Sequence, residues 1–294
     1  MAMERPLTSW ADGHDPVAED PRQPDLERPA AMFELAIPVA GTRMNGHVYV
    51  AAGAGPHPAV VLLHGYPGNE RSLDLAQALR RGGMDVLFFH YRGSWGSGGL
   101  FSWKSSAEDV EAALRFLRTP AARERYRVDP ERIALVGHSL GAWLSLFVAA
   151  RAPEVRAAVA LGLENLGADA RLYQRDEGER EAWLAYLRST VGEGLPIRAE
   201  SAEALFAEQQ ENADAFDLIP LAPALRDRPV LLVGGTRDWE LPPAEHQHPV
   251  ADALRRAGST RVEDVVLEAD HSFSDCRIEL CRLVLAWLQR ALGL

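Results

Sequence analysis

The sequence has little cysteine and almost no lysine, and its hydrophobic runs are short. Lys104 is the only lysine among 31 basic residues, and 42 acidic residues give a formal net charge of -11. A surface with this excess of negative charge repels nucleic acid and anionic lipid unless basic residues gather in a patch, and the sequence shows no such patch. We therefore expect no nucleic acid and no membrane among the partners of this protein.

The small cysteine content excludes the two usual structural roles of this residue. Cys276 and Cys281 are the only cysteines, and they lie in one helix-like stretch with a spacing unsuited to a local zinc pair. Two cysteines also cannot build a disulfide framework. We expect both to be free thiols in a reducing compartment, which predicts a cytoplasmic protein.

No segment is long and apolar enough to target the chain or to cross a membrane. The longest apolar runs, Ala59–Leu63 and Leu140–Ala150, are far shorter than the roughly 20 residues that span a bilayer. Residues 1–31 are rich in proline, acids and arginine and lack the apolar run of a signal peptide. We expect a soluble protein with a flexible N-terminal arm over residues 1–31.

Beyond residue 31 the chain alternates between strand-like and helix-like segments. The expected strands are 32–39, 44–51, 59–63, 85–89, 132–136, 155–161, 230–233 and 262–267. The expected helices are 73–81, 105–118, 139–151, 243–257 and 273–292. Strands that alternate with helices in this way indicate an α/β fold with a doubly wound, mostly parallel sheet.

One stretch, residues 163–216, interrupts this alternation. It holds no strand-like run, only charged helical segments separated by glycine and proline. The flanking segments 32–162 and 217–294 then form one domain. An insertion that follows a strand end is a usual place for a helical cap over an active site. The alternative is a solvated helical decoration that takes no part in a site.

The segment Gly137–Gly141 has the pattern G-x-S-x-G and lies between an expected strand and an expected helix. In that context the pattern predicts a nucleophile elbow, a sharp turn that exposes the Ser139 hydroxyl above the sheet. The two glycines leave room for the strand and the helix to approach each other. The pattern also arises by chance around ordinary serines, but the flanking strand and helix favour a nucleophile.

A serine nucleophile needs a base and an acid that orients the base, here in the chain order serine, acid, histidine. Asp238 follows the expected strand 230–233, and His271 follows the expected strand 262–267. Both leave carboxyl ends of strands, at the edge of the sheet that also carries Ser139. We predict a catalytic triad of Ser139, Asp238 and His271.

Other acids and histidines fit these roles less well. Glu240 lies further from its strand than Asp238 does, and Asp270 would have to fold back on the adjacent base. His246 and His248 lie in or before a helix, where they are better read as surface residues. This histidine pair also has no third ligand nearby, so we expect no metal site.

Acyl transfer also needs hydrogen-bond donors for the oxyanion. The elbow supplies the backbone N–H of Leu140, and the Gly-rich loop 64–69 after the first central strand supplies that of Tyr66. We expect Tyr66 and Leu140 to form the oxyanion hole. The ring of Tyr66 either lines the acyl pocket or packs the loop.

A second Gly-rich loop, residues 91–99, lacks the spacing and the lysine of a phosphate-binding loop, so we expect no nucleotide and no other cofactor. Arg92 is expected to tie neighbouring loops together. Trp95 and Trp103 either form a wall of the substrate pocket or pack under the cap. Trp183, within the insertion, faces either the pocket or a neighbouring molecule.

Together these motifs resemble those of the α/β-hydrolase superfamily, and within it the catalytic domains of the prolyl oligopeptidase and acylaminoacyl peptidase group. The resemblance covers about residues 32–294. The motifs that carry it are His64-Gly65-Tyr66-Pro67-Gly68, Tyr91-Arg92-Gly93, Gly137-His138-Ser139-Leu140-Gly141, Gly235-Thr236-Arg237-Asp238 and Asp270-His271-Ser272-Phe273. It implies an eight-stranded, mostly parallel sheet flanked by helices. The residues that it implies for the site are Ser139 as nucleophile, His271 as base, Asp238 as acid, and Tyr66 with Leu140 as oxyanion hole.

Members of that group usually carry a β-propeller before the catalytic domain, whereas this sequence has a short arm and a helical insertion. The difference favours a small ester over a peptide. We therefore predict a metal-independent serine hydrolase that cleaves carboxylic esters through an acyl-enzyme. The alternatives are a serine peptidase or amidase acting on short peptides or acyl-amino acids, and a non-catalytic ligand-binding homologue. The sequence does not indicate an oligomeric state.

Overall fold

A computed structural model describes residues 14–294 and shows one eight-stranded sheet. The strands lie in the spatial order β1-β2-β4-β3-β5-β6-β7-β8. β2 pairs antiparallel with both neighbours, and all the other pairs are parallel. The strands are β1 (Ala31–Val39), β2 (Thr42–Val50), β3 (His57–Leu63), β4 (Asp85–Phe89), β5 (Val128–His138), β6 (Val155–Leu161), β7 (Val230–Gly235) and β8 (Val262–Leu267). The predicted α/β fold with a mostly parallel sheet is confirmed.

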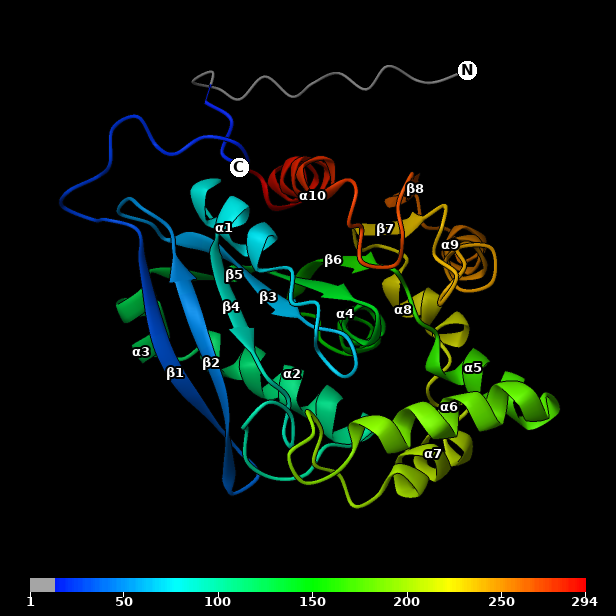
Figure 1. Cartoon of the computed structure of the whole chain (residues 1–294). Coiled ribbons are helices and arrows are strands. Elements are labelled where there is room, and N and C mark those ends of the chain that lie inside the picture. Colours follow the sequence, from blue (N-terminus) through cyan, green and yellow to red (C-terminus); the bar gives the residue numbers. More distant parts are fainter. Residues whose placement is uncertain (1–13) are drawn as a thin grey trace.

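Helices cover both faces of this sheet (Figure 1). On one face, α1 (Leu73–Arg81) and α10 (Arg277–Leu292) lie side by side and contact each other. The helices on the other face are α2 (Trp103–Leu117), α3 (Pro120–Tyr126), α4 (Leu140–Ala149), the 3-10 turn η1 (Ile219–Leu221), α8 (Ala222–Leu225) and α9 (Gln247–Arg256). The short helices α3 and α8 are additions to the elements expected from the sequence.

Alternate residues of the central strands point to opposite faces and build two hydrophobic cores. In β3, Val61 and Leu63 pack on the side of α2 and α4, whereas Val60 and Leu62 pack on the side of α1 and α10. All of these side chains are buried. Because helices cover both faces, the strand is a continuous apolar run rather than an alternating one. The rigid sheet therefore positions the loops that leave its carboxyl edge.

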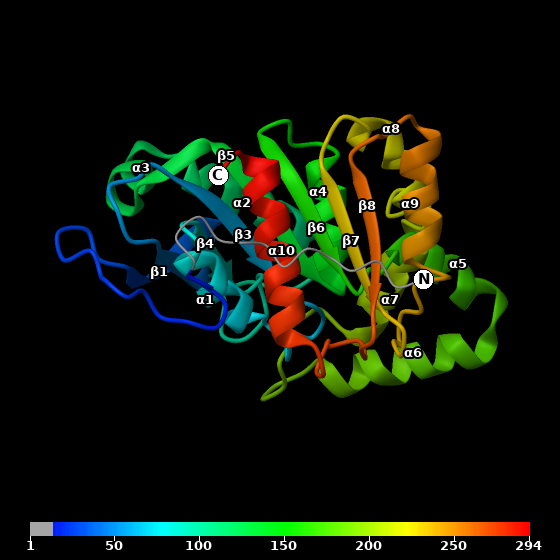
Figure 2. The same cartoon turned by 90° about the horizontal axis from the view of Figure 1, so that it is seen from above.

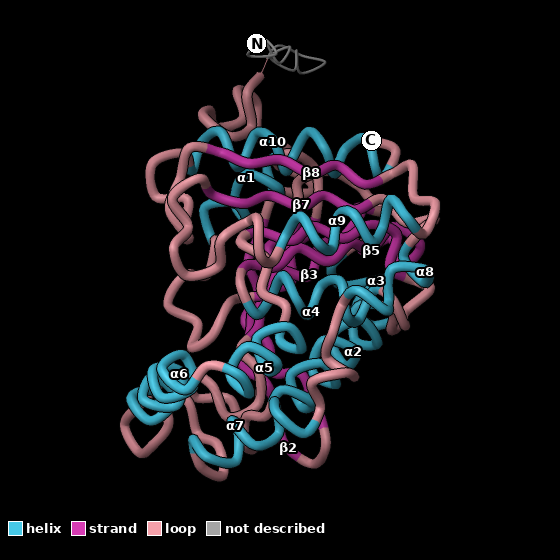
Figure 3. Tube along the Cα trace, turned by 90° about the vertical axis from the view of Figure 1, so that its right-hand side faces the viewer, coloured by secondary structure: helices cyan, strands magenta, loops and turns pink. Residues whose placement is uncertain are grey.

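Residues 163–216 form three helices, α5 (Leu166–Arg175), α6 (Glu177–Thr190) and α7 (Ala202–Glu211). Figure 2 shows α6 along the edge of the sheet at which β7 and β8 end. Seen from the side, α6 and α7 stand at the opposite end of the molecule from α10 (Figure 3). α7 contacts both α6 and α2. The insertion thus lies on the side of the sheet where the predicted site residues emerge.

The N-terminal arm expected over residues 1–31 is described only in part, because residues 1–13 lie outside the described residues. Residues 14–30 contain no helix or strand. Polar contacts fasten this segment to the helices: Arg282 forms an ion pair with Asp15 at 2.5 Å, and Arg81 donates to the carbonyl oxygen of Pro16 at 2.5 Å. The described part of the arm therefore lies against α1 and α10.

No helix within residues 14–294 combines the length and apolarity that a bilayer crossing requires.

A buried carboxyl group at the start of β4 makes the stability of the fold depend on pH. Asp85 is fully buried; its Oδ1 accepts the N–H of Ala51 at 2.8 Å, and its Oδ2 has no partner. Burial raises the pKa of Asp85 to about 7, although the Ala51 N–H and the charge of Arg127 act in the opposite direction. The pKa of an unfolded aspartate is about 4. Between these values the folded state keeps a proton that the unfolded state has released, so stability falls as pH rises.

We expect Asp85→Asn to remove this contribution to the pH dependence. The melting temperature of the variant, relative to the unmodified protein, is expected to increase between about pH 5 and about pH 8. Thermal unfolding at both pH values measures it, with the exposed Asp20→Asn as control. A difference that stays constant with pH would contradict the assignment.

Candidate active site

Ser139 lies at the turn between β5 and α4, at the carboxyl edge of the sheet. Its φ of 56° and ψ of -119° belong to a region that residues with a side chain rarely adopt. The N–H of Ser139 donates to the carbonyl oxygen of Leu161 in β6 at 2.9 Å. A Cβ at Gly137 would overlap the backbone of Gly141, and a Cβ at Gly141 would overlap the backbone of Leu63. The segment therefore forms a sharp strand-to-helix turn that only glycines at these positions allow.

The predicted base and acid meet at the same edge. His271, in the loop after β8, donates through Nδ1 to Oδ2 of Asp238, in the loop after β7, at 2.8 Å. Asp238 is buried, and its Oδ1 accepts the backbone N–H groups of Leu241 at 2.8 Å and Glu240 at 3.2 Å. The hydrogen bond to Asp238 assigns the proton to Nδ1, which leaves Nε2 able to accept a proton.

The charges around His271 favour its protonated form. Burial of the ring opposes protonation, but the hydrogen bond and the negative charge of Asp238 outweigh it and raise the pKa of His271. The carboxylates of Glu240 and Glu164 act in the same direction. His138, next to the serine, packs its ring 4.6 Å from the imidazole and donates to the carbonyl oxygen of His271 at 2.8 Å. Burial lowers the pKa of His138 to about 3, so this ring is neutral and holds the backbone of the base.

Ser139 and His271 flank the end of the same strand. Gly162 follows β6 and packs against the imidazole, because a Cβ added to this glycine would lie 3.0 Å from Cε1 of His271. Within residues 14–294, the Oγ of Ser139 makes no hydrogen bond. Catalytic hydrogen bonds often shorten only when substrate binds, so this geometry is compatible with a serine and histidine that act together.

The loop after β3 brings Tyr66 beside the serine. A Cβ added to Gly65 would lie 2.9 Å from Cβ of Ser139, so this loop packs directly against the elbow. Within the part of the chain that the structure describes, no acceptor pairs with the backbone N–H of Tyr66 or of Leu140. His64 supports the loop from inside through a hydrogen bond of 2.7 Å between its Nδ1 and the carbonyl oxygen of Gly65. Two unpaired donors therefore flank the serine hydroxyl.

The phenol of Tyr66 connects this loop to the insertion. Its hydroxyl lies 2.6 Å from Oγ1 of Thr190, at the end of α6, within hydrogen-bond distance. The ring also packs against Trp183 and Tyr186 of the same helix, with ring centroids 6.1 and 6.2 Å apart. Trp183 and Tyr186 stack on each other at 5.6 Å. Tyr66 thus packs the loop and contacts the insertion at the same time.

The other two candidate pocket residues lie in different surroundings. Trp103 is fully buried, packs against Tyr66, and donates through Nε1 to the carbonyl oxygen of Leu205 at 2.8 Å. Trp95 is 36% exposed, and its Nε1 donates to the carbonyl oxygen of Pro67 at 2.7 Å. The structure therefore places Trp103 behind the Tyr66 ring and Trp95 on the outer side of the loop.

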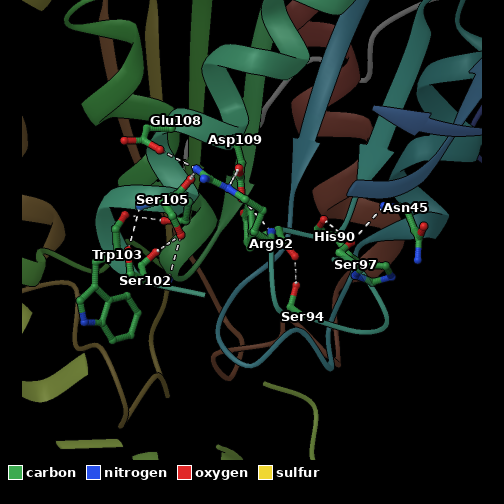
Figure 4. A network of polar contacts seen from close by, with 12 residues as sticks. Asn45, His90, Arg92, Ser94, Ser97, Ser102, Trp103, Ser105, Glu108 and Asp109 are labelled. Carbon is green, nitrogen blue, oxygen red and sulfur yellow. Dashed lines mark hydrogen bonds and ion pairs between the residues drawn. The ribbon is translucent and has the colours of Figure 1, made fainter. Parts of the chain in front are cut away.

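Arg92 ties the second Gly-rich loop to α2 (Figure 4). Its guanidinium binds Asp109 at 2.5 Å and Glu108 at 2.6 Å, and its backbone N–H donates to Asp109 at 2.7 Å. The same loop holds the insertion, because the N–H of Arg198 donates to the carbonyl oxygen of Gly93 at 2.7 Å. Arg92 therefore holds in place a loop that connects the insertion to the rest of the chain.

Two buried acidic residues near this edge of the sheet have little signal in the sequence. Glu164 follows β6 and is 7% exposed, and Asp169, in the first turn of α5, is 5% exposed. The position of Glu164 after a strand end is the one sequence signal for it. Both residues belong to a charged stretch that has the composition of a solvated surface, which conceals their burial.

The remaining histidines take other positions. His246 is buried, and its Nδ1 lies 3.8 Å from Oδ1 of Asp169. His248, in α9, lies 3.3 Å from Oδ2 of Asp264 in β8. Among residues 14–294, no group of three His, Cys, Asp or Glu side chains is arranged to hold a metal ion.

Comparison with known proteins identifies relatives with hydrolytic activities. A profile of the alpha/beta hydrolase family matches residues 60–281. An uncharacterised protein of Mycobacterium tuberculosis is 37% identical over 115 residues, which cover 38% of this chain and 39% of that protein. Esterase EstD of Thermotoga maritima is 31% identical over 137 residues, which cover 44% of this chain and 32% of the esterase. The matched segments thus span well under half the length of these relatives.

A solved structure extends the likeness over most of the chain. The acylaminoacyl peptidase of Pyrococcus horikoshii superposes with a TM-score of 0.68 at 15% sequence identity, over 91% of this chain and 42% of the peptidase. At this identity the superposition shows a shared fold.

Proposed function

Because this chain belongs to the alpha/beta hydrolase family, we propose that it is a serine hydrolase that cleaves carboxylic esters through an acyl-enzyme. The observation that carries the proposal is the hydrogen bond of 2.8 Å between His271 Nδ1 and Asp238 Oδ2, at the edge that carries the Ser139 elbow. Asp238 holds the imidazole in the tautomer that can accept a proton from a serine. The likeness to an esterase of Thermotoga maritima supports the ester as substrate.

The chemistry follows from these positions. The Oγ of Ser139 attacks the ester carbonyl while Nε2 of His271 takes the hydroxyl proton. The oxyanion that forms accepts hydrogen bonds from the backbone N–H groups of Tyr66 and Leu140. The tetrahedral intermediate then breaks its bond to the alcohol oxygen, which receives the proton from His271. Water, activated by the same histidine, hydrolyses the acyl-enzyme, so that the acid leaves and Ser139 regains its proton.

We propose a small ester rather than a long peptide as the substrate. The insertion lies over this edge and reaches the oxyanion loop through the 2.6 Å contact between Tyr66 and Thr190. We expect p-nitrophenyl esters of short acids to be cleaved faster than aminoacyl or peptidyl p-nitroanilides. Faster cleavage of the anilides would assign the protein to the peptidases or amidases.

Labelling with a fluorophosphonate probe tests the proposal. We expect one adduct on Ser139, located by peptide mass spectrometry, because only a serine activated by a base reacts with such a probe. His271→Ala is expected to suppress the adduct, whereas the matched control His248→Ala leaves it unchanged. The absence of an adduct on folded protein would overturn the proposal in favour of a ligand-binding homologue, and an adduct elsewhere would overturn the choice of nucleophile.

A further inference from the structure

Two carboxyl groups beside the His271–Asp238 pair are buried without a cationic partner. Glu164 is 7% exposed and Asp169 is 5% exposed. Among residues 14–294, the Glu164 carboxyl group makes no hydrogen bond or ion pair, and Oδ2 of Asp169 is buried with no partner. Acidic side chains are almost never this buried unless they are paired, because removing their charge from water is costly. The two groups, here called the acidic pair, therefore need an explanation.

One member of the acidic pair, Glu164, lies close in the chain to a residue that contacts His271. Glu164 follows Gly162 closely in the chain, and Gly162 packs against the imidazole of His271. The charge of Glu164 acts on His271, and the charge of Glu164 also acts on Asp169. A substrate atom held by the acidic pair would thus lie near the carbonyl group that Ser139 attacks.

The groups around the acidic pair are neutral or acidic, apart from His271. Glu245 adds to the negative charge near Asp169. His246 lies 3.8 Å from Oδ1 of Asp169, beyond hydrogen-bond distance, and burial lowers its pKa. No arginine or lysine in the described part of the chain forms an ion pair with either acid. When ionised, the two acids therefore have no arginine or lysine partner within residues 14–294.

Burial favours the protonated forms of both groups. Burial raises the pKa of Glu164 to about 7, against the opposing charge of His271. Burial, followed by the charges of Glu164 and Glu245, raises the pKa of Asp169 well above its usual range. A cation that contacts either carboxyl group would favour its ionised form.

Aromatic rings complete the surroundings. Tyr173 stands on α5 beyond Asp169 and stacks on Trp183 of α6, with ring centroids 6.0 Å apart. Burial raises the pKa of Tyr173, and the negative charges of Asp169 and Glu164 act in the same direction. Aromatic faces next to carboxylates are the surroundings in which proteins bind ammonium groups.

We propose that Glu164 and Asp169 bind a primary or secondary ammonium group of the substrate, so that the protein prefers esters that carry an amine. This inference rests on the proposed serine hydrolase function. The ammonium donates hydrogen bonds to the unpaired carboxylate oxygens, and the rings of Tyr173 and Trp183 shield it from water. An organic cation fits better than a metal ion, because no third ligand joins the two acids within residues 14–294.

Substrate pairs that differ only in charge test this proposal. On the acyl side, p-nitrophenyl 6-aminohexanoate is compared with p-nitrophenyl heptanoate; on the alcohol side, 5-aminopentyl butanoate is compared with hexyl butanoate. In at least one pair, we expect kcat/KM of the cationic ester to exceed that of its neutral isostere by about tenfold or more. Equal or lower values for the cationic ester in both pairs would overturn the proposal.

Isosteric variants assign the preference to the acidic pair. Glu164→Gln and Asp169→Asn are expected to reduce the ratio of cationic to neutral kcat/KM to near one, while the neutral ester is still cleaved. Glu181→Gln removes an exposed carboxylate from the same insertion and is expected to leave the ratio unchanged. A ratio that survives in both pair variants would show that other residues select the charge.

Inhibition of the unmodified protein provides a readout that needs no variant. Hexylammonium is expected to inhibit cleavage of p-nitrophenyl heptanoate at a concentration about tenfold or more below that required of hexanol. Equal inhibition by the two compounds would contradict the proposal. Turnover of the neutral ester, and its loss in Ser139→Ala, report separately on the serine hydrolase function, so the two proposals fail in distinguishable ways.

Discussion

Ser139→Ala is expected to lower kcat on p-nitrophenyl butanoate by a factor of about 10⁴ or more while leaving the protein folded. Loss of a triad nucleophile removes the acyl-enzyme route, and only slow attack of water assisted by the oxyanion hole remains. The fold should tolerate the change, because the Ser139 hydroxyl makes no hydrogen bond within residues 14–294. Steady-state kinetics measures the loss, and thermal unfolding provides the control. Unchanged turnover in a folded variant would exclude Ser139 as the nucleophile.

The pH dependence of the unmodified protein gives the matching test of the base. His271 must be neutral to accept the serine proton, and its surroundings raise its pKa above the usual value of about 6.5. We therefore expect kcat/KM on a neutral ester to rise with pH and to level off only above that value. A rising limb centred below about pH 6 would contradict the role of Asp238 in stabilising the imidazolium.

Gly141→Ala is expected to have the second large effect, because it lowers the stability of the fold and does not remove a reacting group. The added Cβ would overlap backbone atoms of Leu63 in the neighbouring strand, which cannot move away as a flexible side chain can. We expect a loss of about 3 kcal/mol or more in the free energy of unfolding, a large part of the stability of an ordinary domain. Denaturant unfolding measures the loss, and hydrolysis should fall with it because the elbow is displaced.

A matched glycine separates this steric effect from helix propensity. Gly178 occupies the same place in α6 that Gly141 occupies in α4, next to the first residue of the helix. A Cβ there would meet only Oδ1 of Asp176, at an ordinary 3.4 Å. Gly178→Ala is expected to leave stability unchanged or to raise it by up to about 1 kcal/mol. A Gly141→Ala variant as stable as Gly178→Ala would refute the close packing of the elbow.

The sheet and the three triad candidates could be predicted because their signals are local. A continuous apolar run such as 59–63 requires cover on both faces, and the structure provides it. Parallel strands all end at one edge, so loops that follow them converge wherever they occur in the chain. The predicted strands 85–89, 155–161 and 262–267 have the bounds observed in the structure. This regularity is sufficient to predict that Asp238 and His271 lie close together.

The surroundings of the triad could not be predicted, because burial in the insertion depends on packing between distant segments. Trp95 and Trp103 have similar local sequences, yet one is 36% exposed and the other is fully buried under α7. Glu164 and Asp169 belong to a stretch whose charge is typical of an exposed surface, yet both are buried, Glu164 between β6 and α5 and Asp169 in the first turn of α5. His138 has no sequence signal for its contact with the backbone of His271, since this contact joins the end of β5 to a loop far away in the chain.

The hydrogen bond between Tyr66 and Thr190 has a consequence for how this protein can acquire new substrates. Helix α6 carries side chains that contact Tyr66, so under the proposed function changes of substrate preference are expected to arise there. The same helix is joined to the loop whose backbone N–H is proposed to stabilise the transition state. A substitution that shifts α6 to admit a different acid or alcohol therefore also shifts an oxyanion donor. Substrate preference and reaction rate are therefore expected to change together when α6 changes. In relatives whose insertion differs in sequence, we expect compensating substitutions in the loop 64–69.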